Sequence, residues 1–67
     1  MREMKKRRKE LGYTQLDVAA RSGVETSTIS RAEVHGFMYP GELARVAKAL
    51  SWEGEPSELL KEASQDE

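Results

Sequence analysis

Four polar side chains close together in the sequence could offer hydrogen bonds to a ligand. Thr26, Ser27, Ser30 and Arg31 lie in the segment 26–35, whose apolar residues recur at helical spacing and leave these four on the outward side. Hydroxyl groups both donate and accept hydrogen bonds, whereas a guanidinium donates from a planar fork. The segment therefore predicts a hydrogen-bonding helical surface.

Two short helices joined by a tight turn are predicted to position this surface. The helical period favours a helix over 15–22, a break at Gly23 and a second helix over 26–35. Gly23 tolerates left-handed backbone, and Ala19 is small where the two helices must cross. The inward-facing apolar residues have the spacing of a helix-turn-helix, and they are Val18, Val24, Ile29 and Ala32.

The residues that follow Ala19 have a specific spacing of small and apolar side chains. A Gly follows it by four positions, and apolar residues follow it by five, ten and thirteen positions. The pair Thr14 and Gln15 and the run TISRAE at 28–33 complete the pattern. Together these residues resemble the lambda-repressor-like family, the Cro/C1 or xenobiotic-response-element type of helix-turn-helix DNA-binding domain.

The resemblance extends from about Met4 to Leu50 and implies a fold and a ligand. The implied fold is all-α, a compact four- to five-helix bundle with a central helix-turn-helix at 15–34. The implied ligand is double-stranded DNA, with the helix at about 26–35 in the major groove.

The resemblance also implies roles for individual side chains. The base-reading positions are occupied by Thr26, Ser27 and Arg31, and Arg31 can fork to guanine O6 and N7. An Arg in the first helix of the family pairs with a Glu near the end of the third, and Arg8 and Glu33 occupy those positions. The side chains expected to contact DNA phosphates are Thr14, Gln15, Thr28, Ser30 and His35. For Thr28 and Ser30 a packing role is the alternative, and Thr14 is also expected to cap the helix that follows it.

Two positions depart from the family pattern within the motif. Glu25 stands where a capping Ser or Thr is usual; its carboxylate complements a helix N-terminus but would face phosphates, so we expect a lower DNA affinity. Ser22 stands where an apolar side chain is usual, and we expect it to weaken the core slightly.

The segment 34–41, VHGFMYPG, departs further, because relatives commonly have Asn-Gly followed by a cation. Phe37, Met38 and Tyr39 replace several phosphate-binding cations. One interpretation is that these three pack over the core; the other is that part of the loop is an exposed patch for a partner.

The remaining helices are predicted from the same periodicity. A first helix spans about 2–11 with Met4, Leu11 and the stem of Arg8 on one face, and a fourth spans 41–50. The core positions of the fourth are Leu43, Val46, Ala47 and Leu50.

The end of the chain is expected to contain a short fifth helix that starts near Pro56. Trp52, Leu59 and Leu60 either close the core or form a dimer seam. Residues 1–62 are expected to form one domain, and residues 63–67 a disordered acidic tail.

Composition excludes several classes of protein. The chain has 67 residues, no Cys, one His and no long apolar run, so we expect no disulfide, metal, cofactor, membrane span or enzymatic activity, and a cytoplasmic location. Residues 1–11 carry six Lys or Arg against two Glu, whereas residues 36–67 carry three against seven Asp or Glu. The basic start could hold phosphates, although the pI of about 5.8 is far below that of a typical nucleic-acid-binding domain.

Two functional hypotheses remain. The first is a sequence-specific transcriptional regulator that pairs weakly in free solution and acts as a homodimer on DNA. The second is a protein-interaction module of the same fold, antitoxin-like or binding a polymerase or another regulator, that uses the loop at 37–39 and the acidic C-terminal part. Fold alone does not choose between them.

Overall fold

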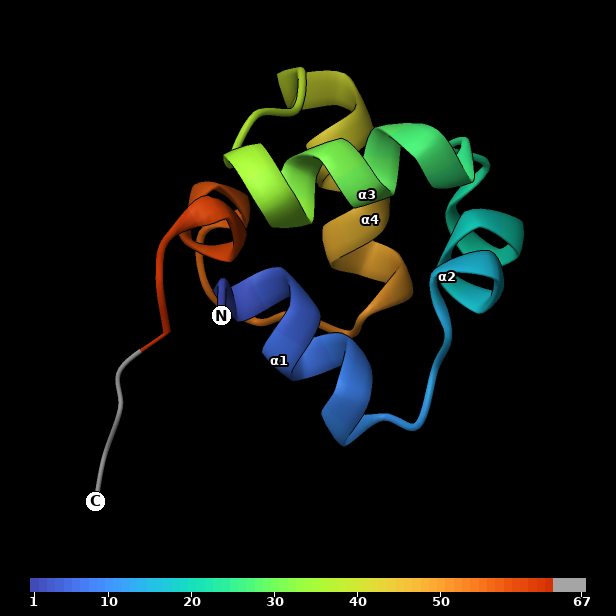
Figure 1. Ribbon diagram of the computed structural model, residues 1–67, viewed down its shortest axis with the longest axis horizontal. Coiled ribbons are helices and arrows are strands. Elements are labelled where there is room, and N and C mark those ends of the chain that lie inside the picture. Colours follow the sequence, from blue (N-terminus) through green and yellow to red (C-terminus); the bar gives the residue numbers. More distant parts are fainter. Residues whose placement is uncertain (64–67) are drawn as a thin grey trace.

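Four α-helices and one 3-10 helix make up the computed structural model, which describes residues 1–63. The elements, in chain order, are α1 (Glu3–Glu10), α2 (Gln15–Ser22), α3 (Thr26–His35), α4 (Pro40–Ala49) and the 3-10 helix η1 (Pro56–Leu60) (Figure 1). Helix α2 packs against both α3 and α4, while α1 packs against α3 and η1. The predicted all-α fold with a central helix-turn-helix is confirmed.

One apolar core joins all five elements. Every apolar residue predicted to face inward along α2, α3 and α4 is buried. The largest fully buried side chains are Met4, Val18, Ile29, Val46, Leu50 and Leu59. Leu11, Tyr13 and Ala19 pack against this core from its edge. No helix among the described residues is both long enough and apolar enough to cross a membrane.

The start of α4 differs slightly from the prediction. Pro40 is the first helical residue, whereas we expected the helix to begin at Gly41. Pro is favoured at this position because its fixed φ suits a helix and its missing N–H would have no partner there. Tyr39 therefore becomes the residue before the helix, with extended backbone.

The turn between α2 and α3 is closed by Gly23 and Ser22. Gly23 has a φ of +75°, which is left-handed backbone that other residues adopt at a cost. The buried Ser22 hydroxyl donates to the Val18 carbonyl and accepts from the Val24 N–H, at 2.7 and 3.2 Å. Its polar atoms are thus satisfied, so Ser22 ties the turn to α2 rather than leaving a defect in the core.

The two ends of the described chain lie side by side. The Ala63 N–H donates to the Met1 carbonyl, and the Glu3 N–H donates to the Lys61 carbonyl, at 2.9 and 2.8 Å. Ala63 is buried, so our prediction that the tail begins at this residue was wrong. Pairing with the N-terminal segment gives its backbone a partner that a free tail would lack. The rest of the predicted tail, 64–67, lies outside the described residues.

Two residues predicted as possible partner surface belong to the core instead. Met38 is 5% exposed and Leu59 is fully buried. Both contribute to the same apolar cluster as Met4 and Ile29. Neither is available to a dimer seam or to a partner, because removing them from the core would cost their buried area.

Candidate nucleic-acid interface

Helix α3 presents a polar strip on the side opposite the core. Ile29, Ala32 and Glu33 are buried on its inner side. Ser27 and Arg31 are exposed, and they lie one turn apart on the outer side. No hydrogen bond or ion pair within residues 1–63 engages the Arg31 side chain. Its five N–H donors are therefore available to a ligand.

The other polar residues of α3 flank this strip. Thr26, Thr28 and Ser30 are half-buried, and His35 is exposed in the last turn. The structure thus places Ser27 and Arg31 at the centre of the exposed side and the other predicted contacts toward its edges.

Val34 is a further exposed residue of α3 that the sequence analysis did not assign. It follows Arg31 by three positions, which places it on the same strip, and it is 64% exposed. An exposed β-branched side chain beside hydrogen-bonding groups can contact an apolar group of a ligand. Its spacing from Ser27 and Arg31 is the sequence signal that could have revealed it.

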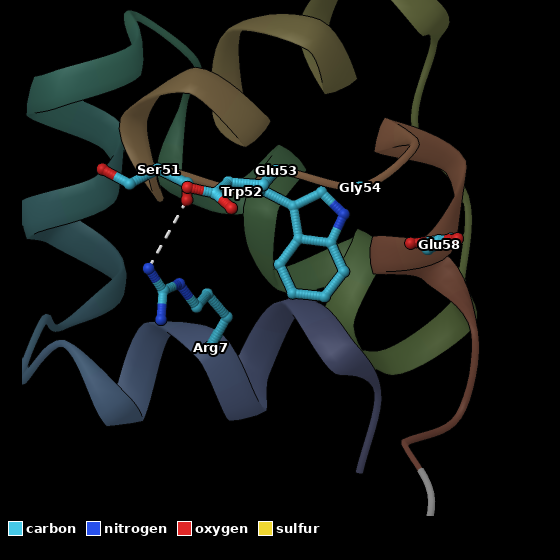
Figure 2. Close-up of a pocket in the computed structure, with 6 residues that line it drawn as sticks. All are labelled: Arg7, Ser51, Trp52, Glu53, Gly54 and Glu58. Atoms are coloured by element: carbon cyan, nitrogen blue, oxygen red, sulfur yellow. Dashed lines mark hydrogen bonds between the residues drawn. The ribbon is translucent and has the colours of Figure 1, made fainter.

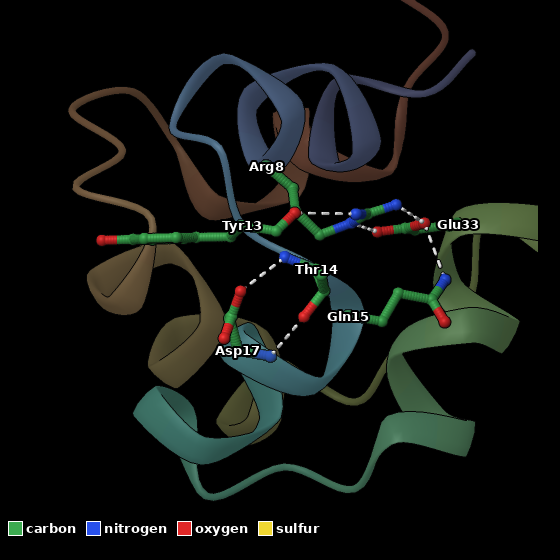
Figure 3. Close-up of polar contacts among 6 residues, drawn as sticks. All are labelled: Arg8, Tyr13, Thr14, Gln15, Asp17 and Glu33. Atoms are coloured by element: carbon green, nitrogen blue, oxygen red, sulfur yellow. Dashed lines mark hydrogen bonds and ion pairs between the residues drawn. The ribbon is translucent and has the colours of Figure 1, made fainter.

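A buried ion pair fixes the inner side of α3 to α1. Arg8 Nε and Nη2 donate to the two carboxylate oxygens of Glu33 at 2.8 and 3.1 Å (Figure 3). Arg8 Nη1 also donates to the Tyr13 carbonyl at 2.9 Å. The two side chains that we expected to pair are thus in two-point contact, and both are buried. Removal of either partner would leave a buried charge.

Gln15 joins the same network. Its Nε2 donates to Glu33 Oε1 at 3.0 Å, so its side chain is turned toward α3 (Figure 3). We expected this amide to reach a phosphate, and one of its two N–H bonds is used within the protein. The second N–H has no partner among the described residues. The network therefore holds the Gln15 amide in a defined place at the first turn of α2.

Thr14 is engaged as a helix cap. Its hydroxyl accepts from the Asp17 N–H at 3.0 Å, and the Asp17 carboxylate accepts from the Thr14 N–H at 2.8 Å. Thr14 thus caps α2 as predicted, and Asp17 completes a reciprocal capping box that was not predicted. The hydrogen bond from the Thr14 backbone, with a further one from its hydroxyl, lowers the pKa of Asp17. A carboxylate thus stays ionised at a helix start where a phosphate was expected.

The Glu25 carboxylate makes no capping hydrogen bond at the start of α3. The residue is exposed, with extended backbone before the first helical residue. It contributes a negative charge next to Thr26 and Ser27. The effect of this charge on nearby phosphates stays a prediction.

The loop between α3 and α4 divides its apolar residues between core and surface. Phe37 and Tyr39 are 52% and 65% exposed, and their rings meet edge to face with centroids 5.0 Å apart. Met38 between them is buried. Packing over the core is thus correct for Met38, and an exposed patch is correct for the two aromatic residues.

A small depression connects this aromatic pair with the strip on α3. Its volume is about 90 Å³, and the residues that line it include Thr28, Arg31 and Glu42 as well as Phe37 and Tyr39. The exposed side of α3 therefore continues into an apolar wall with one carboxylate.

Trp52 lies in a second depression, on the side where α1 faces the segment before η1. Arg7, Glu53 and Glu58 are among the residues that line this space of about 410 Å³ (Figure 2). Arg7 donates to the carbonyls of Leu50 and Ser51, and Trp52 Nε1 donates to the Glu55 carbonyl. The Arg7 bonds tie the segment after α4 to α1, and the Trp52 bond closes the loop before η1.

Of the three apolar residues at the end of the chain, Leu59 is in the core, and Trp52 and Leu60 are half-buried against it. They close the core, which was one of the two roles predicted. Within residues 1–63 no group of three or more His, Cys, Asp or Glu side chains is placed to bind a metal ion.

A comparison with protein-family models matches residues 4–34 to a helix-turn-helix family. This range begins in α1 and ends in α3, so it includes both members of the ion pair, the capping box and the exposed strip. Neither the search of curated proteins nor the search of solved structures found a match.

Proposed function

Since residues 4–34 belong to the Cro/C1-type helix-turn-helix family, we propose that this chain is a sequence-specific transcriptional regulator that inserts α3 into the major groove of DNA. Domains of this family bind DNA and are typically not enzymes. One observation carries the specific mechanism: α3 exposes Ser27, Arg31 and Val34 on one side while Glu33 anchors its opposite side.

Base reading is assigned to the outer side of α3. Arg31 donates two hydrogen bonds to guanine O6 and N7, and it supplies the strongest discrimination. Ser27 and Thr26 bond to neighbouring bases near the start of the helix. Val34 adds an apolar contact with a thymine methyl group. This arrangement combines one strong contact with several weaker ones.

Phosphate contacts are assigned to the edges of the same surface. Glu33 accepts one N–H of the Gln15 amide, which leaves the second N–H free to donate to a phosphate. This amide lies at the first turn of α2, where the helix dipole also favours an anion. The other phosphate contacts are Thr14, Thr28, Ser30 and His35. The contact at Thr14 is weakened by the ionised Asp17 beside it.

The regulator is proposed to bind DNA as two copies. One recognition helix reads only a few base pairs, so two copies with recognition helices about 34 Å apart would read a near-palindrome. Apolar groups that could take part in pairing include the exposed Phe37 and Tyr39 and the accessible parts of the half-buried Trp52 and Leu60. This area is small, so pairing is weak in free solution and is strengthened by DNA.

The exposed aromatic pair supports a second candidate, a protein-interaction module. Phe37 and Tyr39 replace cations at the edge of α3, and Glu42 lies beside them. A protein partner could cover these rings. The two candidates differ in how binding depends on salt.

Salt dependence of binding to random duplex DNA tests the proposal. A DNA-binding protein releases counterions, so its affinity falls steeply as salt rises. Absence of binding to random and selected duplexes at low salt would favour the protein-interaction module. Sedimentation with a selected duplex then tests the pairing: a symmetric site with two copies is expected, and one copy on a non-symmetric site would rule out the dimer.

A further inference from the structure

Three cationic side chains converge on one depression between α2 and α4. Arg21, Arg45 and Lys48 line this depression together with Ser22 and Ala49, and its volume is about 480 Å³. All three cations are exposed. Because α2 and α4 pack closely against each other, the three charges are presented by two fixed helices.

None of these cations is engaged in an ion pair within the described chain. Asp17, one turn before Arg21, hydrogen-bonds Thr14, and the Arg21 charge helps to lower the pKa of Asp17 without a direct ion pair. Like charges in one depression repel each other, and a bound anion would relieve that repulsion.

Arg21 is already held in place. Its guanidinium carbon lies 4.3 Å from the centroid of the Tyr13 ring, within the range of a cation–π contact. A side chain that is ordered before binding loses less conformational entropy when it binds. A guanidinium can also donate two parallel hydrogen bonds to a phosphate, which a lysine cannot do.

Helix polarity explains only part of this cluster. Arg21 and Lys48 stand in the last turns of α2 and α4, where a cation is favoured by the helix dipole. Arg45 lies earlier in α4 and gains little from that effect. Its convergence with the other two therefore points to a ligand.

We propose that Arg21, Arg45 and Lys48 form a binding site for a phosphate-type oxyanion, supplied by a DNA backbone or by a free phosphorylated small molecule. The lining is polar and cationic, which suits such an anion better than an apolar ligand. None of the residues on the outer strip of α3 lines this depression. The site therefore stands independently of the proposed function of α3.

A titration of the full chain with pyrophosphate at constant ionic strength, followed by amide chemical shifts, tests the site. We expect saturable changes confined to residues 21–23 and 45–49. The double variant Arg45→Gln/Lys48→Gln changes two exposed side chains and should weaken pyrophosphate binding at least tenfold. The matched control Lys5→Gln/Lys9→Gln removes the same charge from α1 and should leave the affinity unchanged.

Two results would overturn the site: no saturable change in the unmodified chain, or an equal drop in affinity in the variant and the control. A denaturation curve for each variant shows whether it is folded. Arg21→Gln provides a second folded variant should the double variant not fold.

The source of the anion is decided with random duplex DNA. If DNA phosphates occupy the site, Arg45→Gln/Lys48→Gln should reduce the salt slope by about 0.9 for each phosphate that the variant no longer neutralises, without changing the selected sequence. An unchanged slope, in a variant that no longer binds pyrophosphate, assigns the site to a free phosphorylated molecule. Pyrophosphate binding without any DNA binding would keep this site and remove the function proposed for α3.

Discussion

The inner and outer sides of α3 differ in whether their charged groups have partners within the protein. On the inner side, the buried Glu33 carboxylate accepts hydrogen bonds from Arg8 and Gln15. On the outer side, the exposed Arg31 guanidinium has no partner among residues 1–63. A charge that the protein satisfies contributes to folding, and a charge that it leaves unsatisfied is available for binding. Substitutions on the two sides should therefore affect different measurements.

The largest effect is expected from Glu33→Ala. The change leaves the Arg8 guanidinium buried without its carboxylate, which should cost about 3–5 kcal/mol of unfolding free energy. Urea denaturation followed by circular dichroism measures this loss. Glu42→Ala on α4 is the control, because that side chain makes no ion pair among the described residues.

The double variant Arg8→Ala/Glu33→Ala sharpens the same test. If the pair couples α1 to α3, the unfolding free energies lost in Arg8→Ala and in Glu33→Ala should not add up to the loss in the double variant. The difference should be at least about 0.5 kcal/mol. Additive losses would show that the pair does not couple the helices.

Arg31→Ala should give the opposite result. Stability should change by less than about 0.5 kcal/mol because the side chain is exposed and unpaired. Specific DNA binding should weaken by about 1–3 kcal/mol, and preference should relax at one base position. Binding-site selection measures both. Gln15→Ala is the comparison variant: it should weaken binding to all sequences alike, and it should also lower stability because it removes a hydrogen bond to Glu33. An unchanged selected motif for Arg31→Ala would contradict its assignment.

Gly36→Ala and Gly23→Ala extend the comparison to the ends of α3 and α2. Both residues have left-handed backbone, with φ of +76° and +75°, so each change should cost about 1–2 kcal/mol. A Cβ at Gly36 would also lie 2.8 Å from Arg2 Cζ, whereas a Cβ at Gly23 would meet no atom within 4 Å apart from those of its neighbours in the chain. Arg2 is held by a hydrogen bond to the Leu60 carbonyl, so it cannot move without breaking that bond.

We expect Gly36→Ala to be the more destabilising of the two in thermal denaturation. Arg2→Ala in the same background should remove the difference. Equal drops in melting temperature for the two glycine variants, with Arg2 present, would mean that the Arg2 guanidinium moves aside without a measurable cost.

The smallest effect is expected at the exposed cap of α2. Hydrogen bonds from Thr14 lower the pKa of Asp17 below its usual 3.8 in the folded state. The stabilisation is therefore fully present above pH 3.8 and is lost as the pH falls through the lowered value. Asp17→Asn should melt at a lower temperature than the unmodified chain at pH 7. That difference in melting temperature should shrink below pH 3.8. A difference that stays constant with pH would mean that the Asp17 charge is not its cause.

Local sequence patterns determined the helices and the cap of α2, and the family resemblance predicted the ion pair. Apolar spacing predicted α2 and α3, because burial of one helix side requires apolar residues every three or four positions. The contact between Arg8 and Glu33 was expected from a family pattern, and their geometry is consistent with it. Thr14 was identifiable as a cap because capping depends on residues three positions apart.

Only the tertiary structure decided which loop residues are buried. Phe37, Met38 and Tyr39 are all apolar, yet only Met38 enters the core, because the direction in which the chain leaves Gly36 decides what each side chain meets. Ala63 is ordered because the N-terminal segment lies beside it.

The cluster of Arg21, Arg45 and Lys48 was invisible in the sequence for the same reason. Its members come from two helices that are distant in the chain and meet only when α2 packs on α4. Helical periodicity carries information over a few residues. Contacts between distant elements depend on how whole helices pack, and this single sequence contains no local pattern that encodes them.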